Sequence, residues 1–174
     1  MIREKSVGVI VYRYNPREKD IQYLVLYVRG NYWNFPKGKV EPGETEIQTA
    51  KRELAEETMI KNIQIEKGWR RVSQFSFKED REGKKEAIKK DFVLYLAKLP
   101  KGAKVDISGE HNGFDNGYAW LNYNMACKYL KFKSLKEAIK SADEYIKKQQ
   151  RGHMNKKSVN NKKLNHSNVQ RKQA

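Results

Sequence analysis

The chain has 174 residues, of which 37 are Lys or Arg and 21 are Asp or Glu, so its formal net charge is +16. This length suits one domain with a packed core, and no apolar run approaches the roughly 20 residues that a membrane-spanning helix needs. The single cysteine, Cys127, excludes an internal disulfide, and together with the lack of a signal-peptide pattern it predicts a reducing, cytoplasmic location.

The order of the predicted elements indicates an α+β fold. Segments rich in β-branched and aromatic residues are predicted as strands: residues 6–14, 21–29, 63–77 (as one or two strands), 91–99 and 118–121. Apolar residues three and four positions apart predict helices: residues 45–58, 125–130 and 134–150. The Pro- and Gly-rich segment 31–43 and the charged segment 78–90 are predicted as loops. Such an order favours a mixed sheet with helices packed on it.

The basic charge is concentrated at the C-terminal end. Residues 151–174 contain seven Lys or Arg side chains and no acid. Such a segment buries too little apolar surface to offset the entropy lost on ordering. We therefore predict a folded domain over residues 1–150 and a basic, disordered tail over residues 151–174. The tail is either a site of RNA contact, because phosphates attract its charge, or a solubilising extension.

The predicted helix over residues 45–58 carries an acidic cluster. Glu53, Glu56 and Glu57 are spaced i, i+3 and i+4, so they lie on one side of the helix. That side is about 100° around the helix from the apolar stripe of Ile47, Ala50 and Leu54, which faces the core. Thr45 is a suitable N-cap, and Gln48 stands where a capping box needs Glu or Gln.

Three carboxylates this close repel one another, and a solvated acidic helix face gains nothing from that repulsion. A site for divalent cations does, because Mg²⁺ or Mn²⁺ prefers hard oxygen ligands. A carboxylate cage among basic side chains suits cleavage of phosphate esters or anhydrides. Nearby lysines supply positive charge for such a substrate: Lys37, Lys39, Lys89 and Lys90.

The segment from Gly38 to Ile60 resembles a known signature, the Nudix box G-x5-E-x7-R-E-U-x-E-E-x-G-U. Gly38, Glu44 and the run Arg52-Glu53-Leu54-Ala55-Glu56-Glu57 have its residues and spacing. Met59 stands where the family has the Gly that ends the helix, so we expect a different or mildly strained exit. Residues 3–12, 33–44 and 110–133 also resemble the Nudix hydrolases of asymmetric diadenosine tetraphosphate.

The resemblance implies a Nudix-type α/β/α sandwich with a catalytic loop–helix–loop. It implies Mg²⁺-dependent cleavage, with Mn²⁺ as the alternative ion, of a nucleoside diphosphate linked to another group. Glu53, Glu56 and Glu57 correspond to metal-ligand and base positions. The remaining implied roles are further metal ligation by the Gly38 carbonyl, an extra metal ligand or base at Glu110, a bracing pair of Glu44 and Arg52, phosphate contacts from Lys37 and Lys90, and ring stacking by Phe75 and Phe132.

The leading hypothesis is therefore hydrolysis of a dinucleoside polyphosphate by metal-activated water, with diadenosine tetraphosphate giving ATP and AMP. Three alternatives stay open: an RNA 5′-pyrophosphohydrolase or decapping enzyme, an inositol pyrophosphate phosphatase, and a catalytically inactive nucleotide- or RNA-binding module. The sequence leaves open which glutamate is the general base, how many metal ions bind and what the oligomeric state is.

Overall fold

The computed structural model describes the backbone of residues 2–81, 83–108 and 115–170, and it leaves out the side chains of residues 79, 81, 115, 116 and 153–170. The chain divides into two compact units, residues 1–140 and 141–174. None of the helices in the described ranges combines the length and apolar composition that a membrane span requires.

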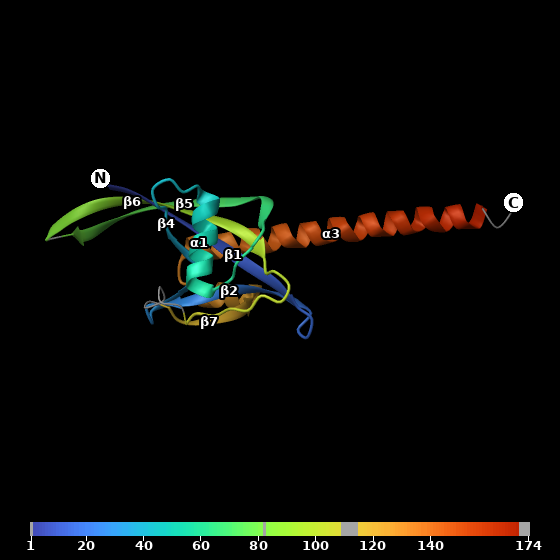
Figure 1. The fold of residues 1–174 in the computed structure, drawn as a ribbon, viewed down its shortest axis with the longest axis horizontal. Helices are drawn as coiled ribbons and strands as arrows, with labels where there is room; N and C mark the ends of the chain where they lie inside the picture. The colour runs from blue at the N-terminus through green and yellow to red at the C-terminus, as the bar shows by residue number, and fades with distance from the viewer. Residues whose placement is uncertain (1, 82, 109–114, 171–174) are drawn as a thin grey trace. The chain divides into compact units, whose positions relative to one another are not determined.

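The first unit is built on a seven-stranded sheet (Figure 1). Its strands in spatial order are β3 (Tyr32–Asn34), β2 (Asp20–Val28), β1 (Ile2–Asn15), β6 (Lys84–Lys98) and β5 (Ile65–Arg81), with β4 (Lys37–Lys39) paired to β1 and β7 (Asp115–Asn122) paired to β2. β1 and β6 run parallel, whereas the other pairs are antiparallel. The predicted mixed sheet is confirmed.

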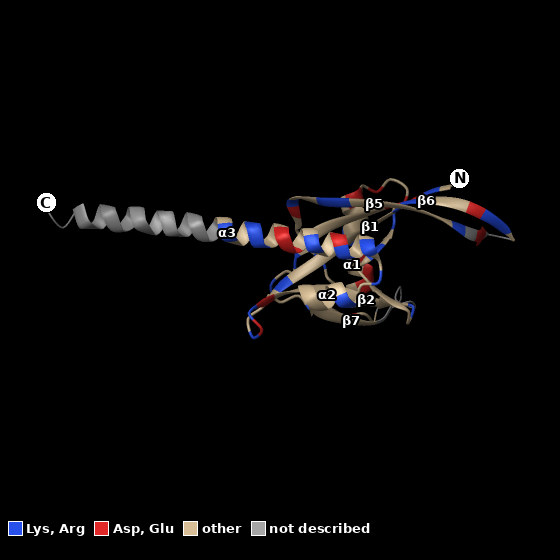
Figure 2. Cartoon of the chain, turned by 180° about the vertical axis from the view of Figure 1, so that it is seen from behind, with Lys and Arg blue, Asp and Glu red and all other residues tan. Residues whose placement is uncertain are grey.

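Helices cover both faces of this sheet. The helix α1 (Glu46–Thr58) stands in front of β1 in Figure 1, and the first turns of α3 (Lys133–Gln170) stand in front of the sheet in the reverse view of Figure 2. A short helix, α2 (Tyr123–Tyr129), follows β7. The predicted α+β sandwich is confirmed, and the strands between its helical layers supply most of the buried apolar side chains among the described residues.

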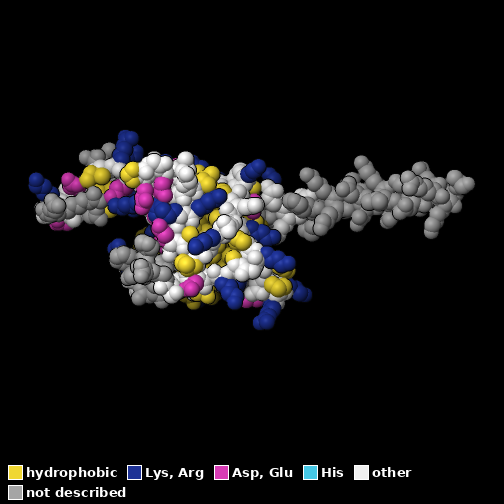
Figure 3. Space-filling view, in the orientation of Figure 1, with side chains coloured by type: hydrophobic (Ala, Val, Ile, Leu, Met, Phe, Trp, Pro, Cys, Tyr) yellow, Lys and Arg dark blue, Asp and Glu magenta, His cyan; other side chains and the backbone are white. Residues whose placement is uncertain are grey.

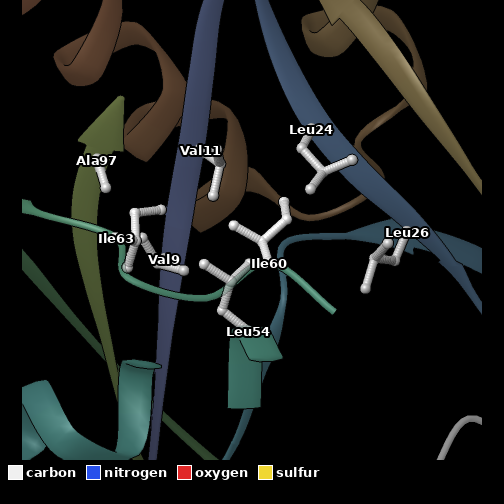
Figure 4. Close-up of a cluster of buried hydrophobic side chains, with 8 residues drawn as sticks. All are labelled: Val9, Val11, Leu24, Leu26, Leu54, Ile60, Ile63 and Ala97. Carbon is white, nitrogen blue, oxygen red and sulfur yellow. The ribbon is translucent and has the colours of Figure 1, made fainter. Parts of the chain in front are cut away.

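A buried apolar cluster fixes the C-terminal half of α1 to the sheet (Figure 4). It consists of Val9, Val11, Leu24, Leu26, Leu54, Ile60, Ile63 and Ala97. Leu54 comes from α1 and Ile60 and Ile63 from the segment that follows it, so the helix is held both by its own face and by the chain leaving it. Burying side chains of this kind contributes about 1.5–3 kcal/mol each.

Two segments predicted as loops are partly strands. Residues 31–43 contain β3 and β4, which are only three residues long each and so leave no periodic signal. In residues 78–90 the strands β5 and β6 continue as far as Arg81 and Lys84, which are still opposite each other. Phe75 and Phe77 are two residues apart on β5, and Ile88 is opposite Phe77 on β6, so these three apolar side chains share one face at the base of the charged ribbon.

The helix α3 continues to Gln170, through most of the segment whose composition predicts disorder. Once a helix is nucleated, each further residue costs little, and this segment contains no proline that would end it. Because the side chains from residue 153 onward lie outside the described residues, a separate basic tail stays a prediction.

The helix α1 ends at a left-handed residue that is not glycine. Met59 has φ 57° and ψ 9°, and its N–H donates a hydrogen bond of 2.9 Å to the carbonyl of Ala55. The chain therefore leaves α1 in the left-handed conformation that glycine normally adopts. For a residue with a side chain, such as Met59, this conformation costs about 1–2 kcal/mol. The expectation of a strained exit agrees with this geometry.

We expect Met59→Gly to stabilise the protein. The side chain is 47% exposed, so little packing is lost, and relief of the left-handed strain adds about 1 kcal/mol to the free energy of unfolding. The midpoint of thermal unfolding should rise by about 2–4 °C. Met59→Ala is the matched control because it removes the same side chain and keeps the strain. An equal gain in both variants would contradict the backbone explanation.

Candidate active site

The capping chemistry predicted for α1 is present. Thr45 has an extended backbone, its hydroxyl accepts from the Gln48 N–H at 3.3 Å, and its own N–H donates to the Gln48 side chain at 2.8 Å. Two N–H groups that a helix end leaves unpaired are thereby satisfied. This capping box fixes where the helix starts and therefore which side chains it turns toward β4.

The buried face of α1 differs from the predicted stripe at one position. Ala50 and Leu54 are fully buried as expected, whereas Ile47 is 42% exposed. Thr49 and Thr58 are buried, and their hydroxyls donate to Glu44 at 2.8 Å and to the Leu54 carbonyl at 2.6 Å. Because both hydroxyls have hydrogen-bond partners, the two threonines can be buried on the face of α1 that packs against the sheet. The apolar pattern had predicted Ile47 on that face instead.

The strand β4 presents a free edge to this helix. Two hydrogen bonds flank its Val7–Gly38 pair with β1: the Val9 N–H to the Pro36 carbonyl and the Val40 N–H to the Lys5 carbonyl. Since bonded and non-bonded pairs alternate in an antiparallel ladder, the peptide groups of Gly38 face β1. Those of Lys37 and Lys39 point to the opposite edge.

Each residue of β4 contacts a different residue of α1. The Lys37 N–H donates to Glu57 Oε2 at 2.9 Å, and the Lys39 carbonyl accepts from Arg52 Nη2 at 2.9 Å. A Cβ on Gly38 would collide with the Glu53 carboxylate. Gly38 therefore lets α1 approach β4 closely, and the helix cannot move away without breaking both hydrogen bonds.

Arg52 organises the acids around it and uses all five of its N–H donors. Its contacts are Nε to Glu44 at 2.6 Å, Nη2 to Glu44 and to the Lys39 carbonyl at 2.9 Å, and Nη1 to Glu53 and Glu56 at 2.9 Å. These bonds lower the pKa of Glu44 to about 2 and, led by the bond to Glu44, raise the pKa of Arg52. The bidentate pair with Glu44 ties the loop before α1 to the helix.

Glu53 and Glu56 converge on one cation, the Nη1 group of Arg52. Burial raises the pKa of Glu53, and the charges of Arg52 and Lys37 oppose that rise. Within the described residues no three Asp, Glu, His or Cys side chains are arranged to enclose a metal ion, because Glu57 is turned toward the backbone of β4.

The donor chemistry nevertheless fits a hard dication. Three carboxylates come from adjacent turns of one helix, and a positive group already lies between two of them. A metal ion would replace Nη1 at Glu53 and Glu56, while the other donors of Arg52 keep their bonds to Glu44 and Lys39. Figure 3 shows the acidic side chains gathered in the region of α1 beside basic ones.

Of the remaining predicted site residues, Lys90 lies on β6, Phe75 on β5 and Phe132 between α2 and α3. The Lys90 Nζ is 3.8 Å from Glu4 Oε2. Phe75 stacks on Phe77 at 6.1 Å between ring centroids, and Phe132 meets Tyr32 edge-on at 5.3 Å. Phe75 and Phe132 are both exposed. Glu110 lies outside the described residues.

Sequence reasoning missed three contributors to this site. These are the Thr49 hydroxyl, the Lys39 carbonyl and the Glu4 carboxylate. Thr49 acts through a hydroxyl inside the helix that donates to Glu44, and Lys39 acts through a backbone oxygen, so a pattern of apolar and charged residues reveals neither. The period-2 alternation of β1 and β6 could have placed Glu4 and Lys90 on one face, had the strand pairing been known.

Comparisons with known proteins agree with this geometry. A family model described as NUDIX domain matches residues 4–144. An asymmetrical bis(5′-nucleosyl)-tetraphosphatase from Mus musculus is 27% identical over 151 residues, which cover 82% of this chain and 95% of that protein. The crystal structure of a C. elegans Ap4A hydrolase binary complex has a TM-score of 0.67 at 25% identity and covers 82% of this chain and 97% of that one. An RNA pyrophosphohydrolase from Pelagibacter ubique is 37% identical over 60 residues, which cover 34% of this chain and 37% of that protein.

Proposed function

The chain belongs to the NUDIX family and is a pyrophosphohydrolase, and from this premise we propose that it cleaves dinucleoside tetraphosphates asymmetrically, with diadenosine tetraphosphate giving ATP and AMP. The observation that carries the proposal is the match to asymmetrical tetraphosphatases over 95% of the length of the mouse protein. The exposed rings of Phe75 and Phe132 support it, because they can stack on bases.

The chain's own residues account for the steps of this reaction. Glu53, Glu56 and Glu57 would hold Mg²⁺, or Mn²⁺ in its place, which lowers the pKa of a water and neutralises phosphate charge. One glutamate accepts the proton of the attacking water, as general bases do. Lys37 and Lys90 neutralise the nucleotide that leaves. Arg52 and Glu44 keep the loop and helix in register during the displacement.

The backbone ligand deserves a separate assignment. The Gly38 carbonyl, predicted as a metal ligand, belongs to a peptide group that faces β1, whereas the Lys37 carbonyl faces the free edge beside Glu57. We therefore favour the Lys37 carbonyl as the backbone oxygen for a metal. Gly38 then contributes by lacking a side chain where the Glu53 carboxylate lies.

An RNA 5′ end is the second candidate substrate. The similarity to an RNA pyrophosphohydrolase supports it over part of the chain, as does the basic composition of residues 151–174, through which RNA contact is proposed. The same carboxylates would act on the triphosphate of such an end.

Product analysis distinguishes the two candidates. With Mg²⁺ and diadenosine tetraphosphate, we expect chromatography to show equal amounts of ATP and AMP, and no turnover when EDTA is added. The kcat/KM should exceed that for a 5′-triphosphorylated RNA by about tenfold or more, since only the dinucleotide carries a base at each end of its polyphosphate chain, one for each exposed ring. Formation of ADP alone would contradict asymmetric cleavage, and a higher kcat/KM for RNA would replace the first candidate by the second.

A further inference from the structure

Three charged side chains form a row on one face of the sheet, next to β4. The Lys39 Nζ lies 3.0 Å from Glu4 Oε1, and the Lys90 Nζ lies 3.8 Å from Glu4 Oε2. Glu4 is opposite Lys90 in the parallel pairing of β1 and β6, and residues directly opposite in a ladder share a face. We call Lys39, Glu4 and Lys90 the lysine row.

The central acid of the lysine row is the most enclosed of its members. The Glu4 side chain is 12% exposed, compared with 66% for Lys39. An enclosed carboxylate needs charged partners, and Glu4 offers a different oxygen to each lysine. Two ammonium groups repel each other and their long side chains are flexible in solvent, so Glu4 is what holds them at a fixed spacing.

The strand β4 connects the lysine row to the acidic side chains of α1. The Lys39 carbonyl accepts from Arg52, while the side chain of the same residue reaches Glu4. Lys37 is placed in the same way, with its N–H on Glu57 and its side chain on the face that Lys39 uses, because the two residues are two apart in one strand. A chain of phosphates bound at this edge therefore has two lysines within reach and a third across β1.

We propose that Glu4 is a positioning residue, which holds Lys39 and Lys90 at a fixed spacing for the phosphates of the polyphosphate chain. This inference rests on the proposed function, in which Lys90 already contacts the phosphates of the leaving nucleotide, and it adds Glu4 and Lys39 to that site. Phosphate oxygens accept hydrogen bonds from both ammonium groups, and the spacing set by Glu4 reduces the ordering that binding would otherwise require.

Binding of inorganic tripolyphosphate in EDTA tests the lysine row without turnover. By isothermal titration calorimetry, Glu4→Gln should weaken binding by about three- to tenfold, the size expected for losing one preorganised charge-assisted contact. Glu137→Gln is the matched control, since it also removes one negative charge but from an exposed pair with Lys133 on α3. Unchanged or tighter binding to Glu4→Gln would overturn the proposal. It would mean that the Glu4 carboxylate has no effect on tripolyphosphate binding or opposes it by charge repulsion.

A double-mutant cycle separates positioning from general electrostatics. If Glu4 acts through Lys39, then Lys39→Gln should cost less affinity in the Glu4→Gln background than in the parent protein. Additive losses would overturn the positioning role. With diadenosine tetraphosphate as substrate, the effect of Glu4→Gln should fall on KM rather than on kcat.

The two proposals fail in distinguishable ways. If the parent protein does not cleave diadenosine tetraphosphate but Glu4→Gln weakens tripolyphosphate binding, the proposed function is wrong and the lysine row stands. If the parent cleaves the dinucleotide and Glu4→Gln binds tripolyphosphate as tightly as the parent does, the role proposed for Glu4 is wrong and the proposed function stands.

Discussion

Glu56→Gln and Glu57→Gln should each lower kcat by about 10²–10⁴-fold, the range expected when a general base or metal-binding carboxylate is lost. Glutamine keeps the shape of the side chain and removes the charge. The Lys37 N–H can still donate to an amide oxygen at position 57 as it does to Glu57, so the fold should persist. The measurement is Mg²⁺-dependent turnover of diadenosine tetraphosphate together with thermal unfolding of each variant.

Glu46→Gln provides the control on the same helix. Glu46 pairs with Lys5 at 2.6 Å and with Arg70 at 2.8 Å, and it accepts from the Tyr95 hydroxyl at 2.7 Å. The bond to Arg70, followed by those to Lys5 and Tyr95, lowers its pKa to about 2. We expect this variant to lose about 1–2 kcal/mol of stability and to keep its kcat. Turnover near the parent level in both Glu56→Gln and Glu57→Gln would refute the assignment of the acidic cluster.

The part of the site that the sequence predicts well is the part that depends on local periodicity. The helical spacing places Glu53 and Glu56 on one side, and the structure has both on Arg52 Nη1. Capping by Thr45 is equally local, because it depends on residues three apart. Such features follow from one helix alone, so no knowledge of its neighbours is needed.

The part that could not be predicted depends on which strands pair. Residues 37–39 are too short to show a strand period, yet their pairing with β1 determines that Lys37 and Lys39, rather than Gly38, turn backbone groups to α1. Glu4 and Lys90 are far apart in sequence and meet only through the β1–β6 register. Long-range register of this kind is set by the whole sheet rather than by neighbouring residues.

Arg52→Gln should be the most destabilising single change in this site. The guanidinium lies within 4 Å of four carboxylates, those of Glu41, Glu44, Glu53 and Glu56. Without it these acids repel one another and Glu44 loses its bidentate partner, which costs about 2–3 kcal/mol. The midpoint of thermal unfolding in EDTA should fall by about 4–12 °C, and turnover should fall as well because the loop before α1 is no longer tied to the helix.

The same variant tests whether Arg52 competes with a metal ion. In the parent protein a dication must displace Nη1 from Glu53 and Glu56, so part of its binding free energy is spent on breaking those bonds. In Arg52→Gln no guanidinium is bonded to Glu53 and Glu56, and a bound ion relieves the repulsion between these carboxylates. Addition of Mg²⁺ should therefore raise the unfolding midpoint of Arg52→Gln more than that of the parent. Arg52→Lys, which keeps one charge without the planar fork, should fall between the two. A smaller Mg²⁺ effect in Arg52→Gln than in the parent would show instead that the guanidinium builds the metal site by holding Glu53 and Glu56 together.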